Sequence, residues 1–170
     1  MSVDHDSIKA NDLLVEGKGL YDAGKYEEAV ASFDKAIEAD SRYATAWRKK
    51  AFALSFLERY DDAMVCYDKA IEIKPKNADA WNYKGNALYY LSRYDDAIAS
   101  YDKATEIDPE KAVAWSNKGH ALLELKKYEE VIASVDKAIE IDPKDGNAWG
   151  RKAFALRRLE RYDDAMLCYD

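Results

Sequence analysis

The sequence repeats itself at a fixed interval of 34 residues. Tryptophan recurs at this step, and a tyrosine later in each interval follows the same spacing. Self-similarity at a fixed period of about 20 to 50 residues indicates an array of small stacked units and not one irregular globule. The recurring residues are Trp47, Trp81, Trp115 and Trp149, together with Tyr26, Tyr60, Tyr94, Tyr128 and Tyr162.

Each interval contains two amphipathic helical segments. Ala29, Phe33, Ala36 and Ile37 show the pattern, because apolar residues three and four positions apart lie on one helix face. We expect helix pairs at 7–23 with 26–39, 44–57 with 60–73, 78–91 with 94–107, 112–125 with 128–141, and 146–159 with a helix that starts at 162.

Glycine and proline mark the ends of these helices. Gly24 can adopt the left-handed conformation that ends a helix. Pro75, Pro109 and Pro143 cannot continue the helices before them. Ser41 occupies the proline position in the first interval, so we expect a weaker helix end there.

The order of residues in each interval resembles the tetratricopeptide repeat. Tryptophan is followed by a small residue four positions later and leucine three after that, and then by tyrosine, alanine, an aromatic residue, alanine and proline, over residues from about 8 to 170. The resemblance implies an all-α fold, a right-handed α-α superhelix or TPR solenoid, in which the first helix of each pair lines a concave groove.

The same resemblance sets the expected domain organisation. We expect a disordered leader at residues 1–6 and a single solenoid over 7–170. It should hold about five repeats, the last of them truncated, at approximately 10–43, 44–77, 78–111, 112–145 and 146–170.

Composition disfavours several classes of protein. The 33 acidic and 26 basic residues give a formal net charge of -7, whereas indiscriminate nucleic-acid binding requires a positive field. No apolar run reaches the about 18 residues of a membrane span, and the N-terminus lacks the apolar core of a secretory signal. We expect a cytoplasmic protein with no nucleic-acid or membrane partner. Cys66 and Cys168 occupy the same position three repeats apart, so we expect two lone thiols.

The sequence predicts no catalytic site, metal site or cofactor. Ser116, His120 and Glu124 lie at four-residue steps on one helix face, but no oxyanion hole or strained nucleophile turn accompanies them. Paired acids such as Asp61 and Asp62 open each second helix, where they favour the positive end of the helix dipole. We expect a protein that is not an enzyme.

The predicted groove positions carry an excess of positive charge. Six cations there, against Asp22, Asp79 and Glu124, leave three net positive charges in an acidic chain. Arginine binds carboxylates bidentately, asparagine bonds peptide groups, and aromatic rings give rigid contact area. The candidate peptide-binding groove consists of Lys18, Arg48, Lys49, Phe52, Asn82, Tyr83, Asn86, Tyr90, Asn117, His120, Asn147, Arg151, Phe154, Arg157 and Arg158.

An internal comparison supports a variable groove on a constant scaffold. Residues 46–68 and 148–170 differ at only five positions, and four of these are predicted groove positions. The alternative reading is that these positions are unconstrained surface. The pairs are Arg48/Gly150, Lys49/Arg151, Ser55/Arg157, Phe56/Arg158 and, outside the groove, Val65/Leu167.

The resemblance implies a protein–protein interaction scaffold that binds an extended peptide, and the positive charge at the groove positions predicts that this peptide is acidic. One alternative is an assembly module that forms homo-oligomers through its terminal helices, because the fifth repeat stops in its second helix. That reading expects an uncovered surface at Trp149, Leu156, Tyr162, Met166 and Tyr169.

A second alternative is a co-chaperone that clamps the C-terminal carboxylate of its partner. Asn86, Asn117 and Arg151 match the family's clamp, whereas Asn82 and Asn147 stand where the family has lysine or arginine. Without those two cations we expect a weaker grip on paired carboxylates.

Overall fold

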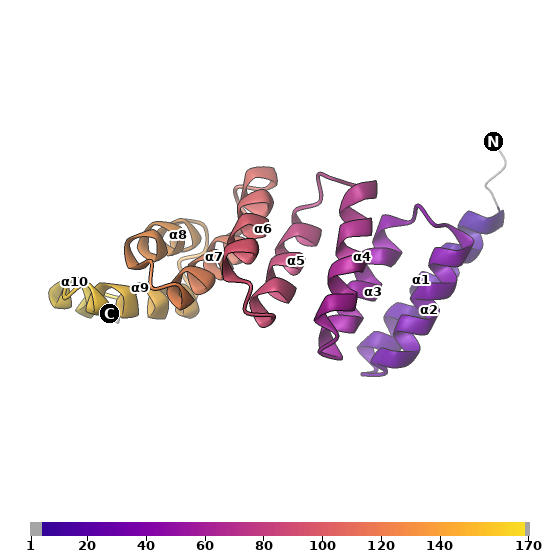
Figure 1. Cartoon of the computed structure of the whole chain (residues 1–170), viewed down its shortest axis with the longest axis horizontal. Helices are drawn as coiled ribbons and strands as arrows, with labels where there is room; N and C mark the ends of the chain where they lie inside the picture. The colour runs from indigo at the N-terminus through magenta and orange to yellow at the C-terminus, as the bar shows by residue number, and fades with distance from the viewer. Residues whose placement is uncertain (1–4, 169–170) are drawn as a thin grey trace. The chain divides into compact units, whose positions relative to one another are not determined.

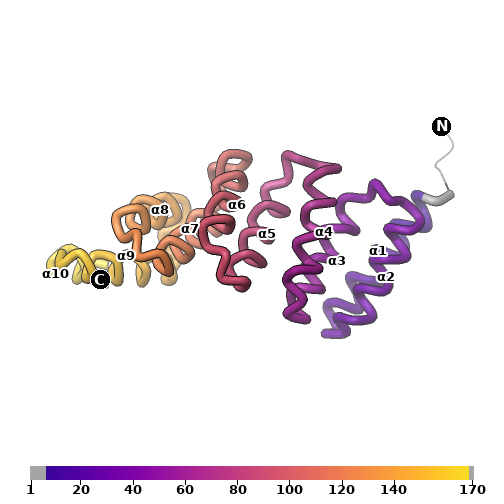
Figure 2. The backbone as a smooth tube through the Cα atoms, in the orientation of Figure 1, coloured from indigo at the N-terminus to yellow at the C-terminus, as the bar shows by residue number. Residues whose placement is uncertain are grey.

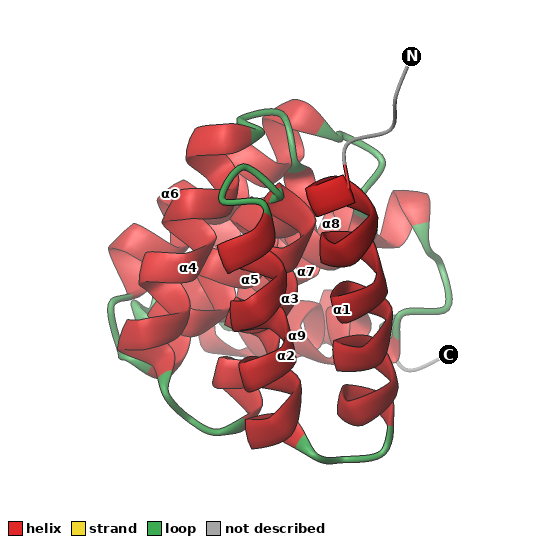
Figure 3. Cartoon of the chain, turned by 90° about the vertical axis from the view of Figure 1, so that its right-hand side faces the viewer, coloured by secondary structure: helices red, strands yellow, loops and turns green. Residues whose placement is uncertain are grey.

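The described part of the protein is built from helices and turns. The computed structural model describes residues 5–168, with side chains from Ser7 onward. These residues form ten α-helices, and no β-strand occurs among them (Figure 3). The all-α class predicted from the sequence is confirmed.

The chain divides into two compact units, Met1–Ala87 and Leu88–Asp170, with the boundary inside helix α5. Within each unit, consecutive helices run antiparallel and are joined by short turns (Figures 1 and 2). The single solenoid expected over 7–170 stays a prediction. The helices are α1 His5–Asp22, α2 Tyr26–Ala39, α3 Ala44–Phe56, α4 Tyr60–Ile73, α5 Ala78–Tyr90, α6 Tyr94–Ile107, α7 Ala112–Glu124, α8 Tyr128–Ile141, α9 Gly146–Arg158 and α10 Tyr162–Met166.

The helix bounds follow the predicted pairs closely, with differences at the two ends of the chain. Helix α1 begins at His5, so it includes the last two positions of the leader expected at 1–6. Residues 1–4 lie outside the described part. Helix α10 ends at Met166, and Tyr169, which was expected on an uncovered surface, also lies outside the described residues.

A left-handed residue ends the first helix of every pair. Gly24 has φ of 75°, as predicted. The same position in later repeats is not glycine, yet Glu58, Ser92, Lys126 and Glu160 have φ between 57° and 61°. The following amide bonds back to a carbonyl five residues earlier, as in Lys25 to Leu20 at 2.9 Å, which satisfies one of the carbonyls left open at a helix end.

The recurring spacing of tryptophan has a structural reason at the junctions between successive repeats. The Nε1–H group of Trp81 donates to the carbonyl of Pro75 at 3.0 Å, and Trp115 does the same to Pro109 at 2.9 Å. Trp47 donates to Ser41 at 2.9 Å. The backbone carbonyl is the acceptor, so serine preserves this contact although it lacks the ring of proline.

Small residues allow the two helices of a pair to approach closely. In unit 1, Gly17 of α1 faces the buried ring of Phe33, and in unit 2, Gly119 of α7 faces the buried side chain of Val135. Val131 is also fully buried one turn before Val135. The two valines therefore fill the space that an alanine and an aromatic ring share in other repeats.

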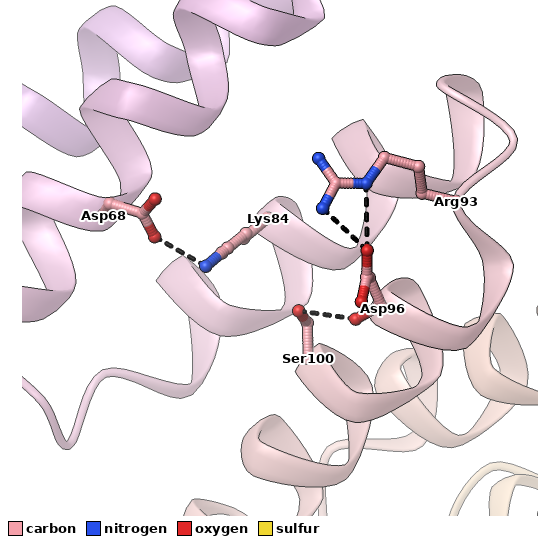
Figure 4. A network of polar contacts seen from close by, with 5 residues as sticks. All are labelled: Asp68, Lys84, Arg93, Asp96 and Ser100. Carbon is pink, nitrogen blue, oxygen red and sulfur yellow. Dashed lines mark hydrogen bonds and ion pairs between the residues drawn. The ribbon is translucent and has the colours of Figure 1, made fainter.

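An ion pair joins each repeat to the next at a constant position. In unit 1, Lys84 of α5 reaches Asp68 of α4 at 2.6 Å (Figure 4). In each such pair the lysine also lies over the tryptophan three residues before it. Lys84 Nζ, for example, is 5.5 Å from the Trp81 ring centroid. The same contact recurs as Lys50–Asp34 in unit 1 and as Lys118–Asp102 and Lys152–Asp136 in unit 2.

A second recurring ion pair lies at the start of the second helix of several repeats. In unit 2, Nε and Nη2 of Arg93 donate to one carboxylate oxygen of Asp96 at 2.9 and 2.7 Å (Figure 4). This places the carboxylate in the first turn of α6, where the helix dipole favours negative charge. Arg59–Asp62 and Arg161–Asp164 repeat it.

Candidate functional site

Unit 1 presents a cluster of aromatic rings on its first helices. Tyr21 of α1 lies at its centre, 5.4 Å from the ring centroids of both Phe52 and Phe56 of α3. Phe52 in turn lies 4.8 Å from Tyr83 of α5. The rings are half-buried except that of Phe56, which is 50% exposed. Because aromatic pairs at such distances pack favourably, they fix α1 against α3 while leaving apolar area in contact with solvent.

Three cations border these rings: Lys18 of α1 and Arg48 and Lys49 of α3. Among the described residues, no carboxylate lies within ion-pair distance of any of the three. Lys49 Nζ lies 6.0 Å from the Phe52 ring centroid. We call these three cations and the rings of Tyr21, Phe52, Phe56 and Tyr83 the basic aromatic face of unit 1.

The electrostatics of this face are dominated by cations that repel one another. Burial lowers the pKa of Lys49, and the neighbouring charges of Arg48 and Lys18 lower it further, more than Asp22 and Asp79 raise it. Arg48 Nε is buried and has no hydrogen-bond acceptor among the described residues. A buried donor without an acceptor is energetically unfavourable, so the guanidinium of Arg48 is incompletely hydrogen-bonded on this face.

Unit 2 carries a different arrangement on the equivalent helix faces. Tyr89 of α5 contacts two side chains of α7, with its hydroxyl 3.0 Å from Glu124 Oε1 and 3.0 Å from His120 Nε2. Arg151 of α9 donates to Ser116 Oγ of α7 at 2.7 Å. We call Tyr89, Ser116, His120, Glu124 and Arg151 the polar cluster of unit 2.

The protons of this cluster follow from its hydrogen bonds. The Tyr89 hydroxyl has one proton, so donation to Glu124 leaves its oxygen to accept from Nε2–H of His120. Burial and the bond to Glu124 raise the pKa of Tyr89 to about 12, so the phenol stays protonated. Burial and then the charge of Arg151 lower the pKa of His120.

The three residues that resembled a catalytic triad in sequence are not connected as one. Ser116 is buried and accepts from Arg151, while His120 bonds to Tyr89. No hydrogen bond joins Ser116 to His120 in the described part of the chain. Over that same part there is no group of three His, Cys, Asp or Glu side chains that could hold a metal ion, and no helix long and apolar enough to cross a membrane.

The last turns of α9 bring two exposed arginines to the surface of unit 2. Arg158 Nε donates to the Tyr128 hydroxyl at 3.2 Å, and its guanidinium carbon lies 5.6 Å from that ring centroid. In unit 1 the equivalent pair is Phe56 stacked on Tyr26 at 5.1 Å. One position of the repeat thus carries an aromatic contact in unit 1 and a cation–π contact in unit 2.

The predicted groove residues differ in their access to solvent. Asn82 is only 2% exposed and lies below the surface, unlike the groove position expected for it. Tyr90, Asn147, Phe154, Arg157 and Arg158 are exposed. The remaining predicted residues are half-buried, namely Lys18, Arg48, Lys49, Phe52, Tyr83, Asn86, Asn117, His120 and Arg151.

Sequence reasoning missed the contacts that organise the polar cluster. The candidate set omits Tyr89, Ser116 and Glu124, although Glu124 is counted among the charges at the predicted groove positions. The signal was available in the numbering, because adjacent first helices meet at offsets of 31 and 35 residues, as in Tyr89 with His120 and Ser116 with Arg151.

Antiparallel helix pairs with a constant joint define a tandem helical-repeat protein, in which each repeat contacts mainly its neighbours. A model described as tetratricopeptide repeat matches residues 78–111 and 112–145, and one described as TPR repeat matches 17–55 and 57–89. A further tetratricopeptide repeat model matches 135–166. The chain belongs to the tetratricopeptide repeat family, as its sequence predicted.

Solved structures with the same fold include the following three proteins. MamA 41-end from Desulfovibrio magneticus RS-1 is 21% identical with a TM-score of 0.86, covering 95% of this chain and 91% of that one. PilF of Pseudomonas aeruginosa is 24% identical with a TM-score of 0.87, covering 97% and 75%. YrrB, described as a TPR protein with an unusual peptide-binding site, is 23% identical with a TM-score of 0.77, covering 92% and 80%. Comparison with curated protein sequences gives no match.

Proposed function

We propose that this protein is a non-catalytic scaffold that binds an extended, acidic peptide of a protein partner on the first-helix faces of its repeats. The observation that carries the proposal is the basic aromatic face of unit 1, where Lys18, Arg48 and Lys49 lie beside partly exposed rings without ion-pair partners. Cations held next to rigid apolar area suit a ligand that combines carboxylates with apolar side chains.

Unit 2 supports the same ligand class through its exposed residues. Arg157 and Arg158 lie in the last turn of α9, and Phe154 on the same helix is 50% exposed. The peptide-binding site named for the structurally similar YrrB agrees with this use of the fold. The cytoplasmic location expected from the sequence stays a prediction.

A binding assay with matched peptides tests the proposal. Fluorescein-labelled peptides of alternating aspartate and leucine would be compared with asparagine–leucine versions, each with a free and an amidated C-terminus, at low and high salt. We expect the aspartate peptides to bind more tightly and to lose affinity with salt, because exposed charges are screened. Equal binding of aspartate and asparagine peptides would contradict the proposal.

Charge variants of the protein separate a specific face from net charge. Replacing Arg157 and Arg158 by alanine should weaken binding of the aspartate peptide by roughly five- to tenfold, since each contributes long-range attraction. The control variant replaces Lys103 and Lys137, which lie in the second helices and already pair with Glu106 and Glu140. The two variants change the net charge equally, so an equal loss of affinity would show that no particular face is used.

The amidated peptides also test the carboxylate-clamp alternative. A clamp requires the free C-terminal carboxylate, so amidation should abolish binding if it operates. The burial of Asn82, one of the clamp positions, favours recognition of internal acidic residues instead. Binding that survives amidation would support that preference.

Self-association is the second candidate function. Tyr162 and Met166, which were expected to be uncovered, are 60% and 69% exposed, and Leu167 is 69% exposed, so apolar area lies uncovered at and just after α10. Leu156 was also expected there, but it is buried. The proposed occupant is a second copy of this chain. Light scattering should then show dimers that the substitution Met166→Glu dissociates, whereas a monomer at high protein concentration would exclude this function.

A further inference from the structure

We propose that unit 1 holds a subsite, formed by Lys18, Arg48 and Lys49, for oxyanion chemistry with a total charge of about −2. The inference rests on the proposed peptide-binding function and specifies which group of the acidic partner is bound at unit 1. The ligand chemistry is a phosphorylated side chain, or two adjacent carboxylates, next to an aromatic or large aliphatic residue.

The first argument is the contrast between these three cations and others in unit 1. The other half-buried cations of unit 1, Lys50 and Lys84, each lie within ion-pair distance of a carboxylate. Lys18, Arg48 and Lys49 do not, although they are half-buried and come together from two helices. An anion bound among partly buried cations would stabilise them, because it offsets their mutual repulsion.

The second argument is the buried Nε–H group of Arg48. It has no acceptor among the described residues and is enclosed by protein atoms, so the guanidinium is incompletely hydrogen-bonded within the protein. Arginine presents its donors in a fixed fork that matches the oxygens of phosphate or carboxylate groups. An oxyanion would meet the terminal nitrogens of the half-buried Arg48, and not its enclosed Nε, and would compensate the charge of the guanidinium.

The third argument is the charge of the group required. Burial and the repulsion from Arg48 and Lys18 both act on Lys49 and lower its pKa. One carboxylate would neutralise only one of the three cations. A phosphomonoester has a charge of about −2 and three acceptor oxygens, which fits this set better.

The fourth argument is the neighbouring aromatic surface, which defines the residue beside the anion. Lys49 lies over Phe52, and Phe52 contacts both Tyr21 and Phe56. Phe56 is half exposed, so a ligand ring or a leucine can contact it. The basic aromatic face therefore favours a short segment in which an apolar residue adjoins the charged group.

Unit 2 provides an internal comparison at the same repeat positions. The positions of Lys18, Arg48 and Lys49 are occupied there by His120, Gly150 and Arg151. Arg151 already donates to Ser116, and Gly150 has no side chain. The cation triplet is therefore a property of unit 1, and its ligand preference should depend on unit 1 alone.

The test uses four fluorescein-labelled peptides, Gly-Ala-Phe-X-Ala-Gly, with X as serine, phosphoserine, a single glutamate or Glu-Glu. Fluorescence polarisation would measure each against the intact protein. We expect the phosphoserine or the Glu-Glu peptide to bind at least about tenfold more tightly than the serine peptide. The affinity of the single-glutamate peptide should lie between that of the serine peptide and that of the doubly charged peptides. The ratio of phosphoserine to Glu-Glu affinity identifies which doubly charged group is preferred.

Variants of the protein then locate the effect. Arg48→Asn introduces the residue that the third repeat has at this position, and Lys49→Gln removes the second charge. Each should abolish most of the tenfold preference. Lys69→Gln is the control, because it removes an exposed charge that is already paired with Glu72. Circular dichroism confirms that each variant is folded.

The outcomes separate this inference from the proposed function. If acidic peptides bind but Arg48→Asn and Lys49→Gln leave the preference unchanged, the subsite is wrong and the scaffold function stands. Equal affinities for serine and phosphoserine, with Glu-Glu no tighter than single glutamate, also overturn the subsite. If none of the four peptides and none of the aspartate peptides binds, both proposals fail.

Discussion

Substitution of Gly119 by alanine should destabilise the protein although alanine is the better helix former. A Cβ atom at this position would lie 2.6 Å from Cγ1 of Val135 and 3.8 Å from the carbonyl oxygen of Val131. Val135 is completely buried, and its β-branched side chain has little freedom to rotate away. The clash must therefore be relieved by movement of α7 relative to α8.

The expected size follows from two opposing effects. Overpacking a buried site costs about 1–3 kcal/mol. Alanine in place of glycine inside a helix gains about 1 kcal/mol. We therefore expect Gly119→Ala to lower the free energy of unfolding by about 1 kcal/mol, within a range of about 0–2 kcal/mol.

Urea unfolding followed by circular dichroism, in a double-mutant cycle with Val135→Ala, provides the assay. Without the valine methyl groups the clash is absent, so Gly119→Ala in that background should stabilise the protein by up to about 1 kcal/mol. The coupling between the two substitutions should then be about 1–3 kcal/mol.

Gly150 is the matched control within the same fold. It also lies inside a helix, α9, but no atom lies within 4 Å of a Cβ placed there. Gly150→Ala should therefore stabilise the protein by about 0.5–1 kcal/mol. The reasoning is refuted if Gly119→Ala stabilises as much as Gly150→Ala, or if its effect is the same with and without the methyl groups of Val135.

The remaining predictions concern titration and thiol reactivity. Burial lowers the pKa of His120 from its ordinary 6.5, so its neutral form contributes stability that is complete above pH 6.5 and is lost as pH falls through the lower folded pKa. In a His5→Gln variant, proton NMR should show a titration midpoint of His120 below pH 6.5. A midpoint at or above pH 6.5 would refute the prediction. Burial raises the pKa of Cys66 to about 11, so a disulfide reagent should label half-exposed Cys168 first and Cys66 only in urea. Labelling of Cys66 without urea in a Cys168→Ser variant would contradict this prediction.

The sequence predicted the helices well because their determinants are local. The spacing of Ala29, Phe33 and Ala36 sets which face of α2 is buried, and all three are buried as expected. Gly24 and the prolines mark turns through backbone restrictions that hold in any context. The apolar spacing recurs from interval to interval, so each interval supports the assignment of the others.

The contacts of the candidate surfaces were less accessible to sequence reasoning. Asn82 and Arg48 occupy the same repeat position, yet Asn82 is buried while Arg48 is half-buried, because a short side chain stays below the surface that a long one reaches. The hydrogen bond of Arg151 to Ser116 depends on how far α9 slides along α7. Helical periodicity fixes the face of a helix, but it does not fix this displacement between two helices.

The left-handed turns show a third kind of limit. Among these turn positions only Gly24 indicates the left-handed conformation by its residue type. The same conformation is adopted by the non-glycine residues Glu58, Ser92, Lys126 and Glu160. A non-glycine residue in this region is unfavourable by itself, and the backbone hydrogen bonds of the turn and the packing of both helices impose it. The repeat position, and not the residue type, was the available signal.

The ion-pair joint between repeats has a consequence for how such a chain can grow. The second, third and fourth repeats each bring their own tryptophan and lysine near the start and their own aspartate in the second helix, as in Trp81, Lys84 and Asp102. An in-frame duplication of one 34-residue segment therefore leaves every joint complete on both sides of the insertion. Gene duplication can lengthen this protein without compensating mutations, and the surface residues of the new copy are then free to diverge.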